Sequence, residues 1–192
     1  MTVSCTRPNG TSFTLETRTA VAGSYSLSFQ PDRAGLWTVK ASWEGNLNYE
    51  GAESNTLTFT VNKASVTIAT SLSRDSLDQG QSLSISGSTS PPLSGILVLL
   101  AYQRSDGYLT RSVTTSADGS FADDFTPDKD GRWTVTASWA GNADYLAATS
   151  SLASFTVRQS FPLLYIVLGM AVVGVAVLLF VMRRGAHPTP EH

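Results

Sequence analysis

The sequence predicts an all-β protein, and composition, alternating segments and an internal repeat support this fold class. Ser, Thr, Gly and Val are abundant, whereas runs of Glu, Lys, Leu and Ala are scarce, which favours strands and turns over helices. Residues 23–61 align with residues 119–157 without a gap, with 20 identities in 39 positions. One helix is expected in addition, in an apolar run near the C-terminus.

The second copy of the repeat, residues 63–158, carries seven segments that we expect to form strands. Each is an alternating or short apolar run bounded by Gly, Pro, Asp or Asn, which is typical of strands in a turn-rich protein. The segments are ASVTIATSLS, QSLSISGSTS, GILVLLAYQR, YLTRSVTTSADG, SFADDF, GRWTVTASW and SLASFTV. RDSLDQG, between the first two, is interpreted as a turn. Strands at spacings of roughly ten residues favour an antiparallel β-sandwich of immunoglobulin-like type.

The first copy, residues 1–62, is an incomplete sandwich. Met1–Arg7 aligns with the third strand of the second copy, because TRPNG occupies the place of QRSDG. Counterparts of residues 65–72 and 82–88 are missing, so five strands are expected, among them the counterpart of SFADDF at residues 24–29. A sandwich without two strands exposes core and an unpaired edge. We expect truncation of a longer chain; the alternative is strand exchange, in which another protomer supplies the missing strand.

Residues 161–182, FPLLYIVLGMAVVGVAVLLFVM, contain no charge and would span roughly 33 Å as a helix, enough to cross a bilayer. A buried core helix is the alternative, but nothing amphipathic flanks the run. Arg183 and Arg184 follow directly, and such positive charge stays cytoplasmic. We therefore expect a single-pass cell-membrane protein with an extracellular N-terminal part and a cytoplasmic tail at 183–192. MTVSCTRPNG has no apolar export signal, so the signal is expected upstream.

The repeat resembles the tandem Ig-like domains of bacterial and archaeal cell-surface proteins. The resemblance rests on GSFADDFTPDKDGRWTVTASWAGNADYLAATSSLASFTV, on the matching stretch from Gly23 to Val61, and on the TRPNG turn, and it covers about residues 1–158. It implies a modular extracellular stalk, often placed just before a C-terminal membrane anchor. It implies no catalytic residues, and a fold alone does not fix function.

Little in the sequence points to catalysis or to a cofactor. Net charge is −2 and charged residues make up 15%, so no basic field attracts nucleic acid. His187 and His192 lie in the tail, away from Cys5, the single cysteine, so a nucleophile with its base is not expected. We expect no enzyme, cofactor or metal site. Acidic residues cluster in the second copy, where turns and solvated charge are favoured over the alternative of calcium binding; they are Asp118, Asp123, Asp124, Asp128 and Asp130.

Paired tryptophans are the main candidates for ligand contact. Trp133 and Trp139 share one face of a strand, as Trp37 and Trp43 do in the first copy, because alternate strand residues face the same side. The first tryptophan of each pair is assigned to the core. The second lies beside a Gly-Asn loop, near a tyrosine, and is the candidate for stacking on a sugar; the candidate contacts are Trp43, Trp139, Tyr49 and Tyr145. Asn9-Gly10-Thr11 fits the N-glycosylation pattern, which makes Asn9 a candidate acceptor.

These observations predict a membrane-anchored cell-surface stalk that displays an upstream region. The expected partners are the lipid bilayer and other cell-surface proteins or glycans. Two alternatives stay open: an adhesin or carbohydrate-binding surface module, and the membrane anchor of an upstream extracellular hydrolase.

Overall fold

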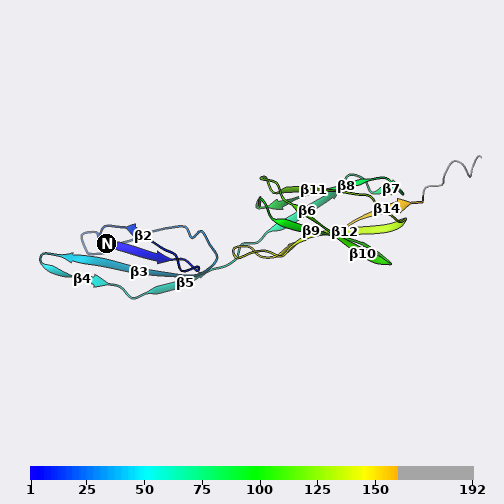
Figure 1. Ribbon diagram of the computed structural model, residues 1–192. Coiled ribbons are helices and arrows are strands. Elements are labelled where there is room, and N and C mark those ends of the chain that lie inside the picture. The colour runs from blue at the N-terminus through cyan, green and yellow to red at the C-terminus, as the bar shows by residue number, and fades with distance from the viewer. Residues whose placement is uncertain (160–192) are drawn as a thin grey trace, which may run out of the picture.

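The computed structural model describes residues 1–159, and within that range it contains β-strands and no helix, so the all-β prediction is confirmed there. The strands form two successive units (Figure 1). The first unit contains β1 (Thr2–Thr6), β2 (Ser12–Glu16), β3 (Gly35–Asn46), β4 (Tyr49–Glu53) and β5 (Leu57–Val61). The second contains β6 (Thr67–Leu72), β7 (Ser76–Asp78), β8 (Leu83–Ser90), β9 (Leu97–Arg104), β10 (Gly107–Thr114), β11 (Ser120–Phe125), β12 (Gly131–Trp139), β13 (Ala148–Thr149) and β14 (Ala153–Arg158).

The predicted membrane helix at 161–182 and the tail at 183–192 lie outside the described residues. Residues 1–159 hold no helical segment with the length and hydrophobicity needed to span a bilayer.

The second unit is a sandwich of two sheets. One sheet has the order β10-β9-β12-β14-β7, with β13 paired to β12, and the other has the order β11-β8-β6. Alternate residues of β12 are buried, from Trp133 to Trp139, so one side of this strand faces the core. Inward side chains of β6 and β8, among them Ile68 and Ile85, belong to the same hydrophobic cluster. The core therefore lies between the two sheets.

The first unit repeats only one of these sheets. Its strands have the order β2-β1-β3-β4, with β5 also paired to β3. The register of β1 on β3, with Val3 opposite Ala41, matches that of β9 on β12, with Leu100 opposite Ala137. Within the described residues, no second sheet faces it. An irregular segment, residues 17–34, runs over the sheet instead (Figure 1).

Three aromatic rings form the same cluster in both units. In the second unit, Trp133 stacks on Phe155 with ring centroids 6.4 Å apart and an interplanar angle of 6°, and Phe125 meets Trp133 edge to face at 5.4 Å. The corresponding residues of the first unit are Phe29, Trp37 and Phe59. Trp37 stacks on Phe59 at 6.2 Å and 12°. Large aromatic side chains contribute strongly to core energetics, so this cluster anchors each unit.

Strand assignment at three places differs from the prediction. Residues 24–29 are not a strand, because the strand that would pair with them has no counterpart in the first unit. The predicted turn RDSLDQG contains β7, which pairs in parallel with β14. Short strands β4 and β13 follow the Gly-Asn loops and pair back onto β3 and β12.

Candidate functional site

Trp37 and Trp133, the first tryptophan of each pair, are core residues. Their exposed fractions are 1% and 6%, and each packs within the aromatic cluster of its unit. The indole nitrogen of Trp37 donates a 3.0 Å hydrogen bond to the carbonyl of Arg33, and that of Trp133 donates one of 3.1 Å to the carbonyl of Lys129. A buried indole N–H needs such a partner. Both rings are therefore fixed and closed to ligands.

The second tryptophan of each pair has a different environment in the two units. Trp139 is 9% exposed and lies 6.3 Å from the ring of half-buried Tyr145. Trp43 is half-buried, and Tyr49 is 69% exposed. A sugar ring needs an open aromatic face to stack on. Of the four candidate contacts, Trp43 and Tyr49 in the first unit offer more open surface than Trp139.

The loops beside these tryptophans share one backbone design. The side-chain oxygen of Asn142 accepts hydrogen bonds of 2.9 Å from the amides of Asp144 and Tyr145. Asn46 does the same, at 2.9 and 3.0 Å, for Asn48 and Tyr49. The preceding glycine has a positive φ in both loops, and a Cβ on Gly141 would lie 2.7 Å from the carbonyl oxygen of Tyr145. Both loops are thus preformed by their own sequence.

In the second unit, this loop holds the joint between the two units. The amide of Ala64 donates to the carbonyl of Asp144, and the amide of Leu146 donates to the carbonyl of Ala64, both at 2.9 Å. Lys63 Nζ donates to the carbonyl of Asn142 at 2.7 Å. Asp144 Oδ1 accepts a 2.9 Å bond from the amide of Ala34 in the first unit. Four hydrogen bonds therefore tie the linker and the first unit to one loop.

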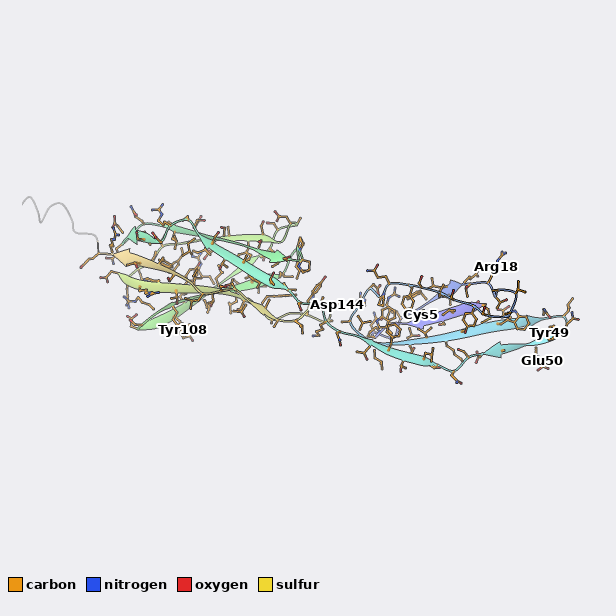
Figure 2. All side chains as sticks on the ribbon, turned by 180° about the vertical axis from the view of Figure 1, so that it is seen from behind. Cys5, Arg18, Tyr49, Glu50, Tyr108 and Asp144 are labelled. Atoms are coloured by element: carbon orange, nitrogen blue, oxygen red, sulfur yellow. The ribbon has the colours of Figure 1, made fainter. Side chains whose placement is uncertain are left out.

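The equivalent loop of the first unit stands at the end of that unit farthest from the joint. Figure 2 shows Asp144 between the two units, whereas Tyr49 and Glu50 lie at the far tip of the first unit. Leu47, in the same tip, is fully exposed. Sequence reasoning placed aromatic residues at these poles but missed the joint, whose residues are ordinary polar and small side chains. The signal available was the short connection between the copies, with Lys63 and Ala64 at the start of the second copy.

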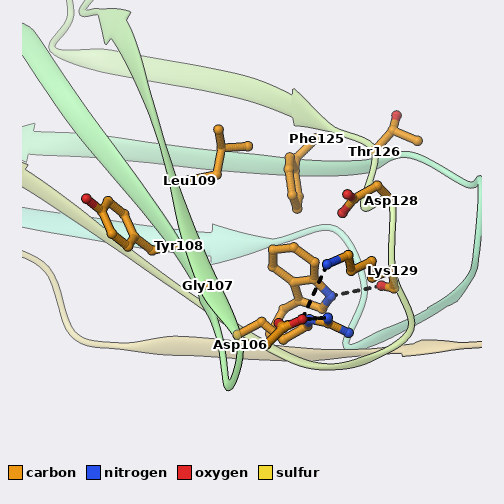
Figure 3. A pocket seen from close by; sticks show the side chains of 10 residues that line it. Asp106, Gly107, Tyr108, Leu109, Phe125, Thr126, Asp128 and Lys129 are labelled. Carbon is orange, nitrogen blue, oxygen red and sulfur yellow. Dashed lines mark hydrogen bonds and ion pairs between the residues drawn. The ribbon is translucent and has the colours of Figure 1, made fainter.

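A shallow hollow of about 340 Å³ lies at the other end of the second unit (Figure 3). The β9–β10 turn and the loop after β11 form its sides, and Asp106 faces Lys129 across it at 3.3 Å. Arg104 donates to Asp106 Oδ1 and to the carbonyl of Asp130, both at 2.6 Å, and its guanidinium lies 5.8 Å from the centroid of Trp133. The hydrogen bond from Arg104, with the nearby Lys129, holds the pKa of Asp106 below its usual value.

The first unit has the same arrangement at its corresponding end. Arg7 is 3.1 Å from Asp32 and lies over the ring of Phe13 at 4.6 Å. Arg7 also lowers the pKa of the Asp32 carboxyl through a side-chain hydrogen bond. In both units, an arginine with its charge paired covers one end of the aromatic core. This favours a structural role for the hollow.

The aspartates considered for calcium binding form hydrogen bonds and ion pairs with different protein groups. Asp118 accepts bonds from the amide and hydroxyl of Ser120, at 3.0 and 2.7 Å, within a turn. Asp123 is buried, accepts a 2.7 Å bond from the Tyr102 hydroxyl and pairs with Arg111 at 3.0 Å. Across residues 1–159, no group of three or more His, Cys, Asp or Glu side chains is arranged to hold a metal ion.

The remaining predicted site residues are placed as follows. Asn9 is exposed in the β1–β2 turn, where its side-chain oxygen accepts bonds from the amide and hydroxyl of Thr11 at 3.1 and 2.7 Å. Arg183 and Arg184 lie outside the described residues. The geometry defines a sandwich-like all-β protein of two repeated units. No family model matches the chain, and no curated protein matches it either.

Proposed function

We propose that the chain is a membrane-anchored cell-surface stalk built from immunoglobulin-like repeats. The joint between the units carries this proposal. A linker of a few residues, held by backbone bonds at Ala64 and by Lys63 and Asp144, restricts swing between the units. The two units consequently extend end to end (Figure 1). Such an arrangement suits a spacer that holds a neighbouring region at a distance.

The membrane-proximal side follows from chain order. β14 ends at Arg158, and the apolar run that is predicted to cross the bilayer begins at Phe161. So short a connection leaves the second unit little freedom to move away from the headgroups. In this arrangement, the end of the second unit that carries Arg104 and Lys129 faces the membrane, and the tip with Tyr49 points outward.

Site-specific labelling in intact host cells tests the proposed topology. Cysteines are introduced at Ser112, exposed on β10, and at Ala186, in the predicted tail, in a Cys5→Ala background. We expect a membrane-impermeant maleimide to label Ser112→Cys in intact cells and Ala186→Cys only after permeabilisation. Labelling of Ala186→Cys alone in intact cells, or of neither position, contradicts a surface stalk of this orientation.

Exposure at the outer tip favours an adhesin or carbohydrate-binding module as the second candidate. Tyr49 and Leu47 are exposed there, and Trp43, on β3 before this loop, is half-buried. Glycan-array binding that is lost on Trp43→Ala and kept on Trp139→Ala, with both variants folded by circular dichroism, supports this function. An array with no bound glycan rejects it.

A further inference from the structure

Two arginines lie on the outer face of the larger sheet of the second unit, at the end where β14 stops. Trp133 is buried in the core, so Arg132 directly before it points outward. Arg132 is opposite Thr156, and Arg158 follows Thr156 by two residues on the same strand, so both arginines lie on one face. Both are exposed, and none of the ion pairs within residues 1–159 involves either of them.

An exposed tyrosine lies on the same face, two strands away from Arg132. Tyr108 is opposite Gln103, which is opposite Thr134, so these side chains form one cross-strand row next to Arg132. Tyr108 is 80% exposed and lies toward the end of the second unit that points away from the first unit (Figure 2). Its ring is apolar and its hydroxyl is polar, which suits a boundary between an apolar and an aqueous phase. We refer to Tyr108, Arg132 and Arg158 as the basal patch.

The first unit lacks these side chains at its corresponding end. The residues at the three positions, given by the 96-residue repeat and the strand register, are Leu36 for Arg132, Asn62 for Arg158 and Ser12 for Tyr108. That end of the first unit meets the second unit, where the amide of Ala34 donates to Asp144. The two ends share one fold but have different neighbours along the chain. We attribute the difference in side chains to what each end contacts.

The chain places an apolar segment directly after the basal patch. Arg158 ends β14, and the uncharged run 161–182 begins three residues later. Three extended residues span at most about 11 Å, so Arg158 stays within that distance of the start of the run. The polar headgroup layer of a bilayer is about 5–8 Å thick on each side. With the run in the bilayer, as in the proposed function, the basal patch lies at the level of the headgroups.

We propose that the basal patch binds acidic phospholipid headgroups of the bilayer in which the chain is anchored. The guanidinium groups of Arg132 and Arg158 donate to lipid phosphates, and the ring of Tyr108 packs at the interface. The patch lies on one face of the unit, so this contact tilts the second unit toward that face. The inference rests on the proposed function, because it needs the run 161–182 in the membrane.

Carboxylates at this end of the unit favour the tilted contact over an upright one. Asp78, opposite Arg158 on β7, is the one acidic side chain among the strand residues of this face within residues 1–159. Three further carboxylates lie in the neighbouring turn and loop: Asp106, Asp128 and Asp130. Asp106 is paired with Arg104 and Lys129. An upright unit would bring these carboxylates against acidic lipid, whereas a unit tilted onto the basal patch keeps the two arginines nearest to it.

Fluorescence quenching in vesicles tests the proposal on the full chain. The protein, in a Cys5→Ala background, is reconstituted into phosphatidylcholine and phosphatidylglycerol vesicles in which some phosphatidylcholine carries a nitroxide on its headgroup. A fluorophore is attached to Gln103→Cys, exposed beside Tyr108, or to Ser86→Cys, exposed on the outer face of the other sheet. We expect quenching at Gln103→Cys to be at least about twice that at Ser86→Cys, since acidic lipid draws the arginine-bearing face to the surface.

Variants that carry the residues of the first unit test which side chains are responsible. Arg132→Leu/Arg158→Asn should reduce quenching at Gln103→Cys to the level of Ser86→Cys, and Tyr108→Ser should reduce it in part. The first unit carries these residues at corresponding positions, so the variants are expected to fold, which circular dichroism checks. Arg74→Leu, at an exposed arginine between β6 and β7 outside the patch, is the matched control and should leave the contrast unchanged.

Several results would overturn the proposal. Equal quenching at the two labelled positions, in protein that floats with the vesicles, rejects the lipid contact and leaves the stalk function standing; protein that does not float with them rejects both. An undiminished contrast in vesicles of phosphatidylcholine alone rejects recognition of acidic lipid. Equal losses in Arg74→Leu and Arg132→Leu/Arg158→Asn reject the basal patch as the site. A contrast that grows with the ratio of protein to lipid assigns the face to contact between copies of the chain.

Discussion

Tyr102 and Asp123 form a buried polar pair in the second unit, with the hydroxyl donating to the carboxylate at 2.7 Å. Burial, reinforced by the bond to Asp123, raises the pKa of Tyr102 well above its ordinary value. The folded state therefore favours the neutral phenol, whereas an unfolded tyrosine ionises near pH 10. The stabilisation linked to this proton is complete below about pH 10 and is lost as the pH rises above it.

We therefore expect Tyr102→Phe to lower the free energy of unfolding by about 1–2 kcal/mol at pH 7, since the buried Asp123 loses one of its donors. The difference from the native protein should shrink above about pH 10. Denaturant unfolding, followed by tryptophan fluorescence in a Trp37→Phe/Trp43→Phe background, reports the second unit. Tyr108→Phe, at an exposed position, is the control. A difference that stays constant to about pH 11 would contradict this linkage.

A second prediction at the scale of one residue concerns Gly87 in β8. Because a Cβ there would overlap the Phe121 ring, Gly87→Ala should destabilise the second unit by about 1–3 kcal/mol. Gly107, at the start of β10, has an ordinary φ, and a Cβ added to it would meet nothing within 4 Å. Gly107→Ala should change stability by less than about 0.5 kcal/mol in the same unfolding assay. Equal effects at the two glycines would show that the Phe121 contact is unimportant.

At the scale of the element, β7 is the strand that the sequence did not predict, since its residues were interpreted as a turn. Its residues Ser76–Asp78 pair in parallel with β14, and Leu77 is 4% exposed. Leu77→Ala should therefore cost about 2–4 kcal/mol of unfolding free energy, as expected for a buried leucine. Leu97→Ala, at a 61% exposed position on β9, is the matched control and should have a much smaller effect. Similar losses for both would argue that β7 adds no core.

The contrast between β7 and β12 shows which elements a sequence can predict here. Nine residues of β12 alternate visibly, so its core face, with Trp133 and Val135, was predicted correctly. A three-residue strand is too short to show a period, and its partner lies far along the chain. Residues 24–29 show the reverse case: a strand-like segment stays irregular because pairing, and not propensity, makes a strand.

The sequence predicted a candidate site residue correctly only where the residue's position in its own strand decides whether its side chain is buried. The repeat and the alternation separated core Trp37 from Trp43 at the strand end. They did not show that Trp139 is buried while Trp43 is only half-buried: Trp139 packs in a core cluster that includes side chains of β6 and β8, and the described first unit has no such strands. The joint at Asp144 was missed because its partners are backbone groups, the amide of Ala34 in the first unit and that of Ala64 in the linker, which side-chain patterns do not reveal.

At the scale of the whole molecule, the joint determines how stiff the two-unit rod is. Asp144 accepts a 2.9 Å bond from the amide of Ala34 in the first unit, and Lys63 in the linker donates a 2.7 Å bond to the carbonyl of Asn142. Removing both side chains leaves only the backbone bonds of Ala64 to hold the linker. Double electron–electron resonance between spin labels on Thr58→Cys and Ser112→Cys, exposed positions in different units, measures the distance distribution. The background carries Cys5→Ala.

We expect a single narrow distance peak in the otherwise native chain and a clearly broader distribution in Asp144→Ala/Lys63→Ala. Asn48→Ala is the matched control, because Asn48 occupies the position of Asp144 in the loop of the first unit. Its neighbour Tyr49 lies far from the joint (Figure 2). That variant should leave the width unchanged. An equally broad distribution in the native protein would mean that these bonds do not hold the units in line, and a rigid spacer would then have no physical basis in the joint.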